Sequence, residues 1–87
     1  MKRLVYPSHV LQRMELRQIE RRQIEIALDE PHIRLPTLDK RRSRVMRKFG
    51  TKTLDVIYEE RRDYIVLVTA VWLGDQDRKV RPGEHSH

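Results

Sequence analysis

The chain has 87 residues, a formal net charge of +6 and a pI near 10.2, and 37% of its residues are charged. This length fits one domain. It contains no cysteine, which excludes disulfides, cysteine-ligated metal sites and thiol catalysis. The apolar stretch after Met1-Lys2-Arg3 ends at Pro7, whereas a secretory signal needs about 7–15 apolar residues and a membrane helix about 20. We therefore expect a soluble cytoplasmic protein with no membrane partner.

The positive charge is concentrated in the middle of the chain. Residues 31–52 have a net charge of +7, whereas residues 1–30 have +1 and residues 53–87 have −2. The basic residues of the middle segment are Arg34, Lys40, Arg41, Arg42, Arg44, Arg47, Lys48 and Lys52. Such a block attracts polyanions by Coulomb attraction and counterion release. Its partner is a nucleic acid or an acidic protein, unless the segment is only a solvated loop that confers solubility.

The first third of the chain predicts a short strand and two helices. Leu4–Tyr6 can form the strand. An apolar stripe predicts a helix from His9 to about Gln18, with Ser8 as its N-cap. A second amphipathic pattern predicts a helix from about Glu20 to Asp29, which Pro31 ends. The stripe of the first helix consists of Val10, Leu11 and Met14.

The rest of the chain alternates with the period of two that is typical of strands. We expect strands at residues 33–38, 43–49, 53–60 and 64–73, the first of them an irregular edge strand. Gly50–Lys52 fits a hairpin loop. Tyr64–Leu73 is apolar on both faces, which predicts the central strand. The fold class is α+β: a single domain over residues 1–74, with two N-terminal helices packed on a three- to four-stranded antiparallel sheet, and a polar tail at 75–87.

One edge of the first predicted helix carries the residues best suited to chemistry. At about 100° per residue, His9, Arg13 and Arg17 fall within roughly 80° of one another. An imidazole can move a proton near neutral pH, and guanidinium groups can hold a phosphate. RNA supplies its own 2′-hydroxyl nucleophile, so cleavage there needs no metal. The alternatives are a histidine that packs or caps the helix and solvated arginines.

Two further features bear on a site. Thr69 lies in the middle of an apolar strand, where its hydroxyl either marks a site or is satisfied within the sheet. Glu84, His85 and His87 have no matching ligand set elsewhere in the chain. We therefore expect no metal and no cofactor.

Two segments together resemble a known family. These are Ser8–Ile19, with its serine-histidine, arginine-methionine and second arginine, and Gln23–Pro31 after it. The strands Leu54–Tyr58 and Ile65–Trp72 resemble the family's last two strands. It is a prokaryotic family of uncharacterised small domains, grouped with RelE/ParE-type toxins in the barnase–EndoU–colicin–RelE fold.

The resemblance covers residues 5–73 and implies a RelE/ParE-like fold and a metal-independent ribonuclease. By motif position it implies four site residues: His9, Arg13, Arg17 and Thr69. One departure is Asp55, where the family often has a basic residue.

Three hypotheses follow. The first is a RelE-like toxin that cleaves RNA, with His9 as general acid or base, Arg13 and Arg17 stabilising the phosphorane, and an antitoxin protein as partner. In this hypothesis the RNA backbone is held by Arg44, Arg47, Lys48 and Lys52. The second is a non-catalytic binding module for nucleic acid or an acidic protein. The third is a homodimer.

Overall fold

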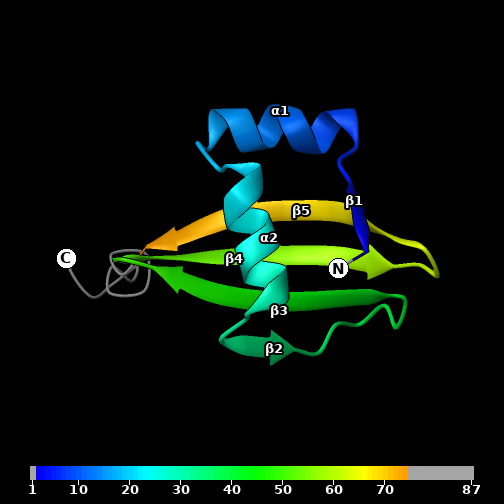
Figure 1. Ribbon diagram of the computed structural model, residues 1–87. Coiled ribbons are helices and arrows are strands. Elements are labelled where there is room, and N and C mark those ends of the chain that lie inside the picture. The colour runs from blue at the N-terminus through cyan, green and yellow to red at the C-terminus, as the bar shows by residue number, and fades with distance from the viewer. Residues whose placement is uncertain (1, 75–87) are drawn as a thin grey trace.

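The computed structural model describes residues 2–74 as an α+β fold of two helices and a five-stranded mixed sheet (Figure 1). The chain runs through β1, then both helices, then the remaining four strands. The elements are β1 (Arg3–Val5), α1 (Ser8–Leu16), α2 (Arg21–Asp29), β2 (Ile33–Leu35), β3 (Arg42–Phe49), β4 (Lys52–Glu60) and β5 (Tyr64–Gly74). The predicted tail at 75–87 lies outside the described residues.

The strand order is β1-β5-β4-β3-β2, with β1 parallel to β5 and the other pairs antiparallel. The predicted α+β class with two helices is confirmed, but the sheet has five strands instead of three to four, and one of its four pairings is parallel. The two edge strands, β1 and β2, have only three residues each. Such short segments show no sequence period from which their pairing could be predicted. The parallel pairing of β1 with β5 joins segments about 60 residues apart, which no local pattern reveals.

The central strand is β4. The apolar sequence of Tyr64–Leu73 predicted that this segment would be central, and that prediction was wrong. β5 does lie inside the sheet order, but β1 pairs only with Tyr64–Val66, and the rest of β5 has no strand on that side. The register between β4 and β5 shifts after Ile57, so that Val68 has no partner in β4. α1 packs on one face of β5, which accounts for the buried apolar side chains there, such as Leu67 and Ala70.

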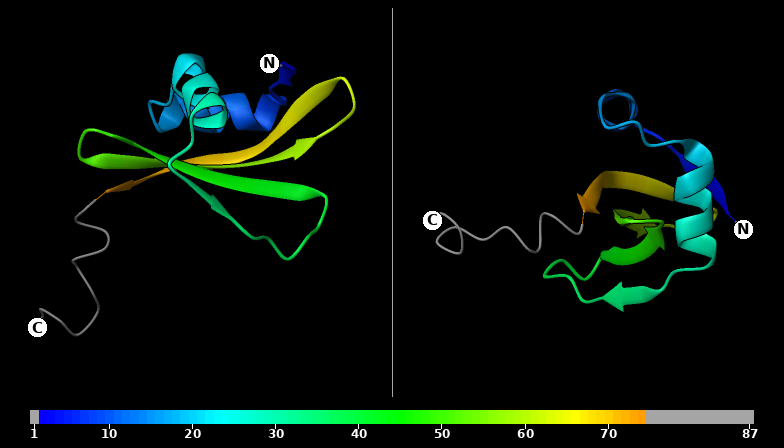
Figure 2. Two further views of the ribbon diagram at one scale, coloured as in Figure 1. Left: turned by 60° about the horizontal axis from the view of Figure 1, so that its bottom comes forward. Right: turned by 90° about the vertical axis from the view of Figure 1, so that its left-hand side faces the viewer.

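Both helices lie on the same face of the sheet (Figure 2). α1 packs along β5, and α2 crosses β4 and β3. The buried core joins helix and strand side chains: Val10, Met14, Ile24, Ala27, Val45, Leu54, Val56, Tyr58, Leu67 and Ala70. Leu54, Val56 and Tyr58 share this face, as their alternation predicted. No helix within residues 2–74 is long and apolar enough to cross a membrane.

The two helices begin differently. Pro7, and not Ser8, is the N-cap of α1, and its carbonyl accepts the amides of Val10 and Leu11 at 2.9 and 3.0 Å. The prediction of a Ser8 cap was wrong because proline, with its fixed φ, sets the entry one residue earlier. α2 begins with a capping box, in which the Glu20 amide donates to Oε1 of Gln23 at 2.9 Å.

The joint between the helices is a Schellman turn. The amide of Ile19 donates to the Met14 carbonyl at 2.8 Å, and the amide of Gln18 donates to the Glu15 carbonyl at 3.2 Å. Gln18 has φ of 57°, the left-handed conformation that such a turn requires and that glycine adopts most easily.

Replacing Gln18→Gly should therefore stabilise the protein. We expect a gain of about 0.5–1 kcal/mol, because the left-handed strain outweighs the extra entropy of glycine in the unfolded chain. The melting temperature should rise by roughly 2–8 °C for a domain of this size. Gln12→Gly, at an exposed position inside α1, is the control and should destabilise by about 0.5–1 kcal/mol. A Gln18→Gly protein that melts lower than wild type would contradict the prediction.

Candidate nucleic-acid interface

The basic middle segment becomes one side of the molecule. β2 and β3 are the last two strands in the sheet order, opposite β1 and α1 (Figure 1). Together with the loop 36–41 and the β3–β4 hairpin, they carry all eight basic residues of the segment. We call this surface the basic side; it consists of Arg34, Lys40, Arg41, Arg42, Arg44, Arg47, Lys48 and Lys52.

Half of the basic side is neutralised by carboxylates. The paired residues are Arg41 with Asp39, Arg42 with Asp39 and Glu59, Arg44 with Asp55, and Arg47 with Glu30. A hydrogen bond from the Arg41 amide, followed by one from its side chain, holds the pKa of Asp39 below its usual value. The other four residues have no carboxylate at ion-pair distance within residues 2–74: Arg34, Lys40, Lys48 and Lys52.

Arg44 is held by a bidentate ion pair with Asp55. Its Nε and Nη2 donate to the two carboxylate oxygens at 2.9 and 2.7 Å. The side chain of Asp55 is 7% exposed and that of Arg44 is 35% exposed. The hydrogen bond to Asp55 raises the pKa of Arg44. The carboxylate thus occupies the fork that was expected to hold a phosphate, although part of the guanidinium remains open to solvent.

This ion pair lies on the face of the sheet that the helices leave open. The neighbours of the pair in sequence, Val45 and Val56, face the helices, so Arg44 and Asp55 point the other way. Thr69 shares this open face, because it pairs with Ile57, which in turn pairs with Arg44. Thr69 therefore lies in one cross-strand row with Arg44 and on the opposite face of the sheet from α1.

The predicted helical stripe lies at the other side of the molecule. His9 and Arg13 are exposed on α1. Arg17 is half-buried, and its Nη1 donates to the carbonyl of Ala70 in β5 at 2.8 Å. α1 lies beside β5, while α2 lies over β4 and β3, between α1 and the basic side (Figure 1). Arg17 therefore reaches the residue next to Thr69, whereas α2 lies between the stripe and the basic side.

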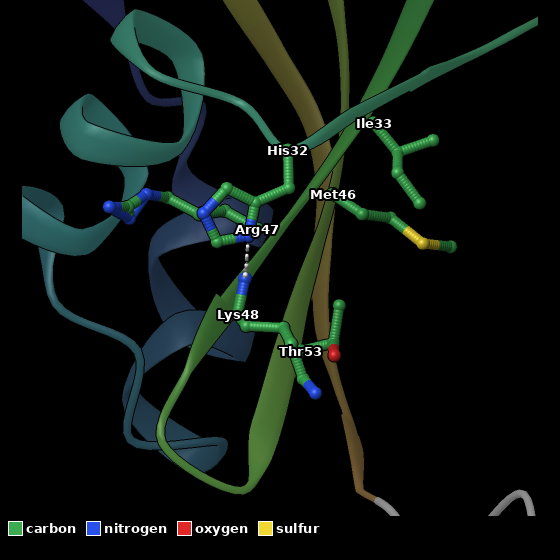
Figure 3. Close-up of a pocket in the computed structure, with 6 residues that line it drawn as sticks. All are labelled: His32, Ile33, Met46, Arg47, Lys48 and Thr53. Atoms are coloured by element: carbon green, nitrogen blue, oxygen red, sulfur yellow. Dashed lines mark hydrogen bonds between the residues drawn. The ribbon is translucent and has the colours of Figure 1, made fainter.

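A histidine that the sequence did not single out lies within the basic side. The backbone amide of Lys48 donates to Nδ1 of His32 at 3.2 Å, as the dashed line in Figure 3 marks. Beside it is a hollow of about 260 Å³ lined by His32, Ile33, Met46, Arg47, Lys48 and Thr53. No sequence pattern pointed to His32, because it follows Pro31 in a predicted loop and meets Lys48 only through the register of β2 and β3.

The hydrogen bond to Nδ1 decides what His32 can do. A neutral imidazole that accepts at Nδ1 carries its proton on Nε2. His32 in this arrangement is a hydrogen-bond donor, suited to a phosphate oxygen. Its acceptor nitrogen Nδ1 is already occupied by the amide of Lys48. The geometry thus favours binding over proton transfer at this residue.

Two other residues that were expected to bind the RNA backbone, Arg47 and Lys52, already make contacts within the protein. Arg47 donates from Nε to the Glu30 carbonyl at 3.1 Å and lies over the ring of Phe49. Lys52 lies over the ring of Trp72, with Nζ 5.7 Å from its centroid. Within residues 2–74 there is no group of three or more histidine, cysteine or acidic residues placed to hold a metal. Glu84, His85 and His87 lie outside the described residues.

Comparison with known families places the chain. The model of DUF4258, a domain of unknown function, matches residues 6–72. The chain belongs to this family. A search of curated proteins and a search of solved structures each found no match. The matched range covers both helices and most of the sheet, so it includes the basic side and the α1 stripe.

Removing the two partners of the central ion pair should have unequal effects on stability. Arg44→Leu leaves the buried carboxylate of Asp55 unpaired, and we expect a loss of about 2–4 kcal/mol. Asp55→Asn leaves a guanidinium that still reaches solvent and an amide oxygen that still accepts from it, so we expect a loss of about 1–2 kcal/mol. Urea unfolding of the two variants measures the difference.

Arg41→Leu is the control for this comparison, because its partner Asp39 lies in an exposed loop; we expect little change. Equal losses for Arg44→Leu and Asp55→Asn, or the reverse order, would show that the burial of the carboxylate does not dominate the energetics of the pair.

Proposed function

We propose that this domain binds RNA through the backbone phosphates, using the basic side. The observation that supports this is that β2, β3 and the adjoining loop and hairpin carry four cations without a carboxylate partner within residues 2–74, with the imidazole of His32 bonded to one of them, Lys48. Phosphate contacts by lysine and arginine supply most of the sequence-independent affinity for nucleic acid. RNA is the proposed nucleic acid because the helical and strand motifs resemble a family of small domains that is grouped with the RelE/ParE-type toxins.

Binding of this kind should depend steeply on salt. For a single-stranded RNA of about ten nucleotides, the slope of log K against log salt should be roughly −0.7 for each phosphate that is neutralised. The four unpaired cations predict a slope of about −3. Lys48→Gln with Lys52→Gln should reduce its magnitude by about 1.4, as measured by fluorescence anisotropy at several salt concentrations.

Arg22→Gln with Arg62→Gln removes the same charge from exposed positions outside the basic side and is the matched control. This variant should keep most of the slope. A slope that is flat in wild type, or one that both double variants reduce equally, would argue against a dedicated interface.

A second candidate function is a RelE-like toxin that cleaves RNA without a metal and is neutralised by an antitoxin. It is favoured by the position of His9 and Arg13, which lie one turn apart on the exposed surface of α1 with no hydrogen-bond or ion-pair partner within residues 2–74. These groups are free to approach a phosphodiester. The resemblance to a family that is grouped with these toxins supports the same function. In this candidate, the RNA would reach α1 from outside the basic side.

Incubation with total RNA and ribosomes, in the presence of a chelator, separates the two functions. If the domain is a binding module, the RNA stays intact. If it is a toxin, wild type cuts RNA and slows growth when expressed, and His9→Ala lowers the cleavage rate by about 10²–10⁴. Gln12→Ala, at another exposed position of α1, is the paired control, because this side chain has no role in the proposed cleavage. Equal cleavage by wild type and His9→Ala would remove His9 from the mechanism.

A further inference from the structure

A second hollow lies at the connection between β2 and β3. Its volume is about 370 Å³, within the range of about 300–1,000 Å³ that is usual for ligand sites. Four of its lining residues are basic and none is acidic. It is lined by Arg34, Leu35, Pro36, Thr37, Lys40, Arg42, Ser43 and Arg44. Arg34, Lys40 and Arg42 belong to the basic segment of the sequence but were not among the four residues assigned to the RNA backbone.

The charges around this hollow are only partly balanced. Arg42 and Arg44 have carboxylate partners, and none of these carboxylates belongs to the lining. Arg34 donates only to the hydroxyl of Tyr58, at 3.5 Å, and Lys40 has no ion-pair partner within residues 2–74. The hollow therefore has an excess of positive charge and can take an anion without displacing an acidic side chain from its wall.

The wall of the hollow is held in place by local bonds. Oγ1 of Thr37 lies 2.6 Å from the Asp39 carbonyl oxygen and 3.0 Å from that of Arg42. The Arg41 amide donates to Oδ1 of Asp39, and the Arg42 amide donates to the Asp39 carbonyl. The loop 36–41 is thus fastened to the start of β3, and a preformed site loses little entropy when it binds.

We infer that this hollow binds a terminal phosphate monoester of RNA. A monoester carries a charge of about −1.5 to −2 at neutral pH, whereas each internal diester carries −1, so the same cations attract the terminal group more strongly. The hydroxyl of Ser43 in the lining adds a hydrogen-bond donor for the extra phosphate oxygens. This inference rests on the proposed RNA binding and assigns one end of the RNA to one place in the fold.

The test compares three synthetic RNAs of ten nucleotides with the same sequence: one with a 5′-phosphate, one with a 3′-phosphate and one with hydroxyl ends. Wild type should bind at least one phosphorylated strand about tenfold more tightly than the hydroxyl strand. Arg34→Gln with Lys40→Gln should abolish this preference. Lys48→Gln with Lys52→Gln, which removes the same charge elsewhere on the basic side, should weaken all strands but keep the preference.

The outcomes separate this inference from the proposed function. Salt-dependent binding of all three strands with equal affinity would overturn the terminal-phosphate site and leave RNA binding intact. If no strand binds, while inorganic phosphate shifts the amide signals of Arg42 and Ser43 in wild type but not in Arg34→Gln with Lys40→Gln, the hollow binds phosphate and the proposed RNA binding fails. Circular dichroism checks the fold of the variants. If the double variant does not fold, Lys40→Gln alone is the substitute. It removes an exposed group that has no ion-pair partner within residues 2–74, and it should still reduce the preference for the phosphorylated strand severalfold.

Discussion

The packing of two helices on one face of the sheet is the constraint on which the rest of the structure depends. It requires apolar side chains at alternate positions of β3 and β4, such as Val45, Leu54 and Val56, which are fully buried. The positions between them must then face the open side. Asp55 is one of these, and its burial there depends on Arg44, which supplies the charge and the hydrogen bonds that a buried carboxylate needs. The central feature of the open face thus follows from the core.

Elements with a long periodic pattern could be predicted from sequence, and features that depend on register could not. Both helices and the long antiparallel strands appear near their predicted bounds, because eight or more residues are enough for a period to show. The parallel β1 and the capping role of Pro7 left no such pattern. The pairing of Arg44 with Asp55 and the contact of His32 with Lys48 each join two strands, so neither can be read from local spacing.

The bonds that the charged groups already make within the protein are the reason that we propose binding and not cleavage. Arg17 and Arg44 were expected to contact phosphate, but each has a bond within the protein that uses part of its donor capacity. His32 lies among cations but has its acceptor nitrogen occupied. The groups that remain open on the basic side are donors and point charges. Such groups attract and orient a phosphate backbone, whereas proton transfer needs a group with a free acceptor.

The bond from Arg17 to Ala70 also has a consequence for assembly. Beyond Val66, β5 has no neighbouring strand on its outer side, and such edges readily pair with another copy of the chain. The guanidinium of Arg17 occupies one of the carbonyls that an added strand would use, and it places a cation at the edge. A dimer formed by joining the β5 edges would have to displace this arginine. Arg17, which was first considered for catalysis, thus opposes the pairing of a further strand with the open edge of β5.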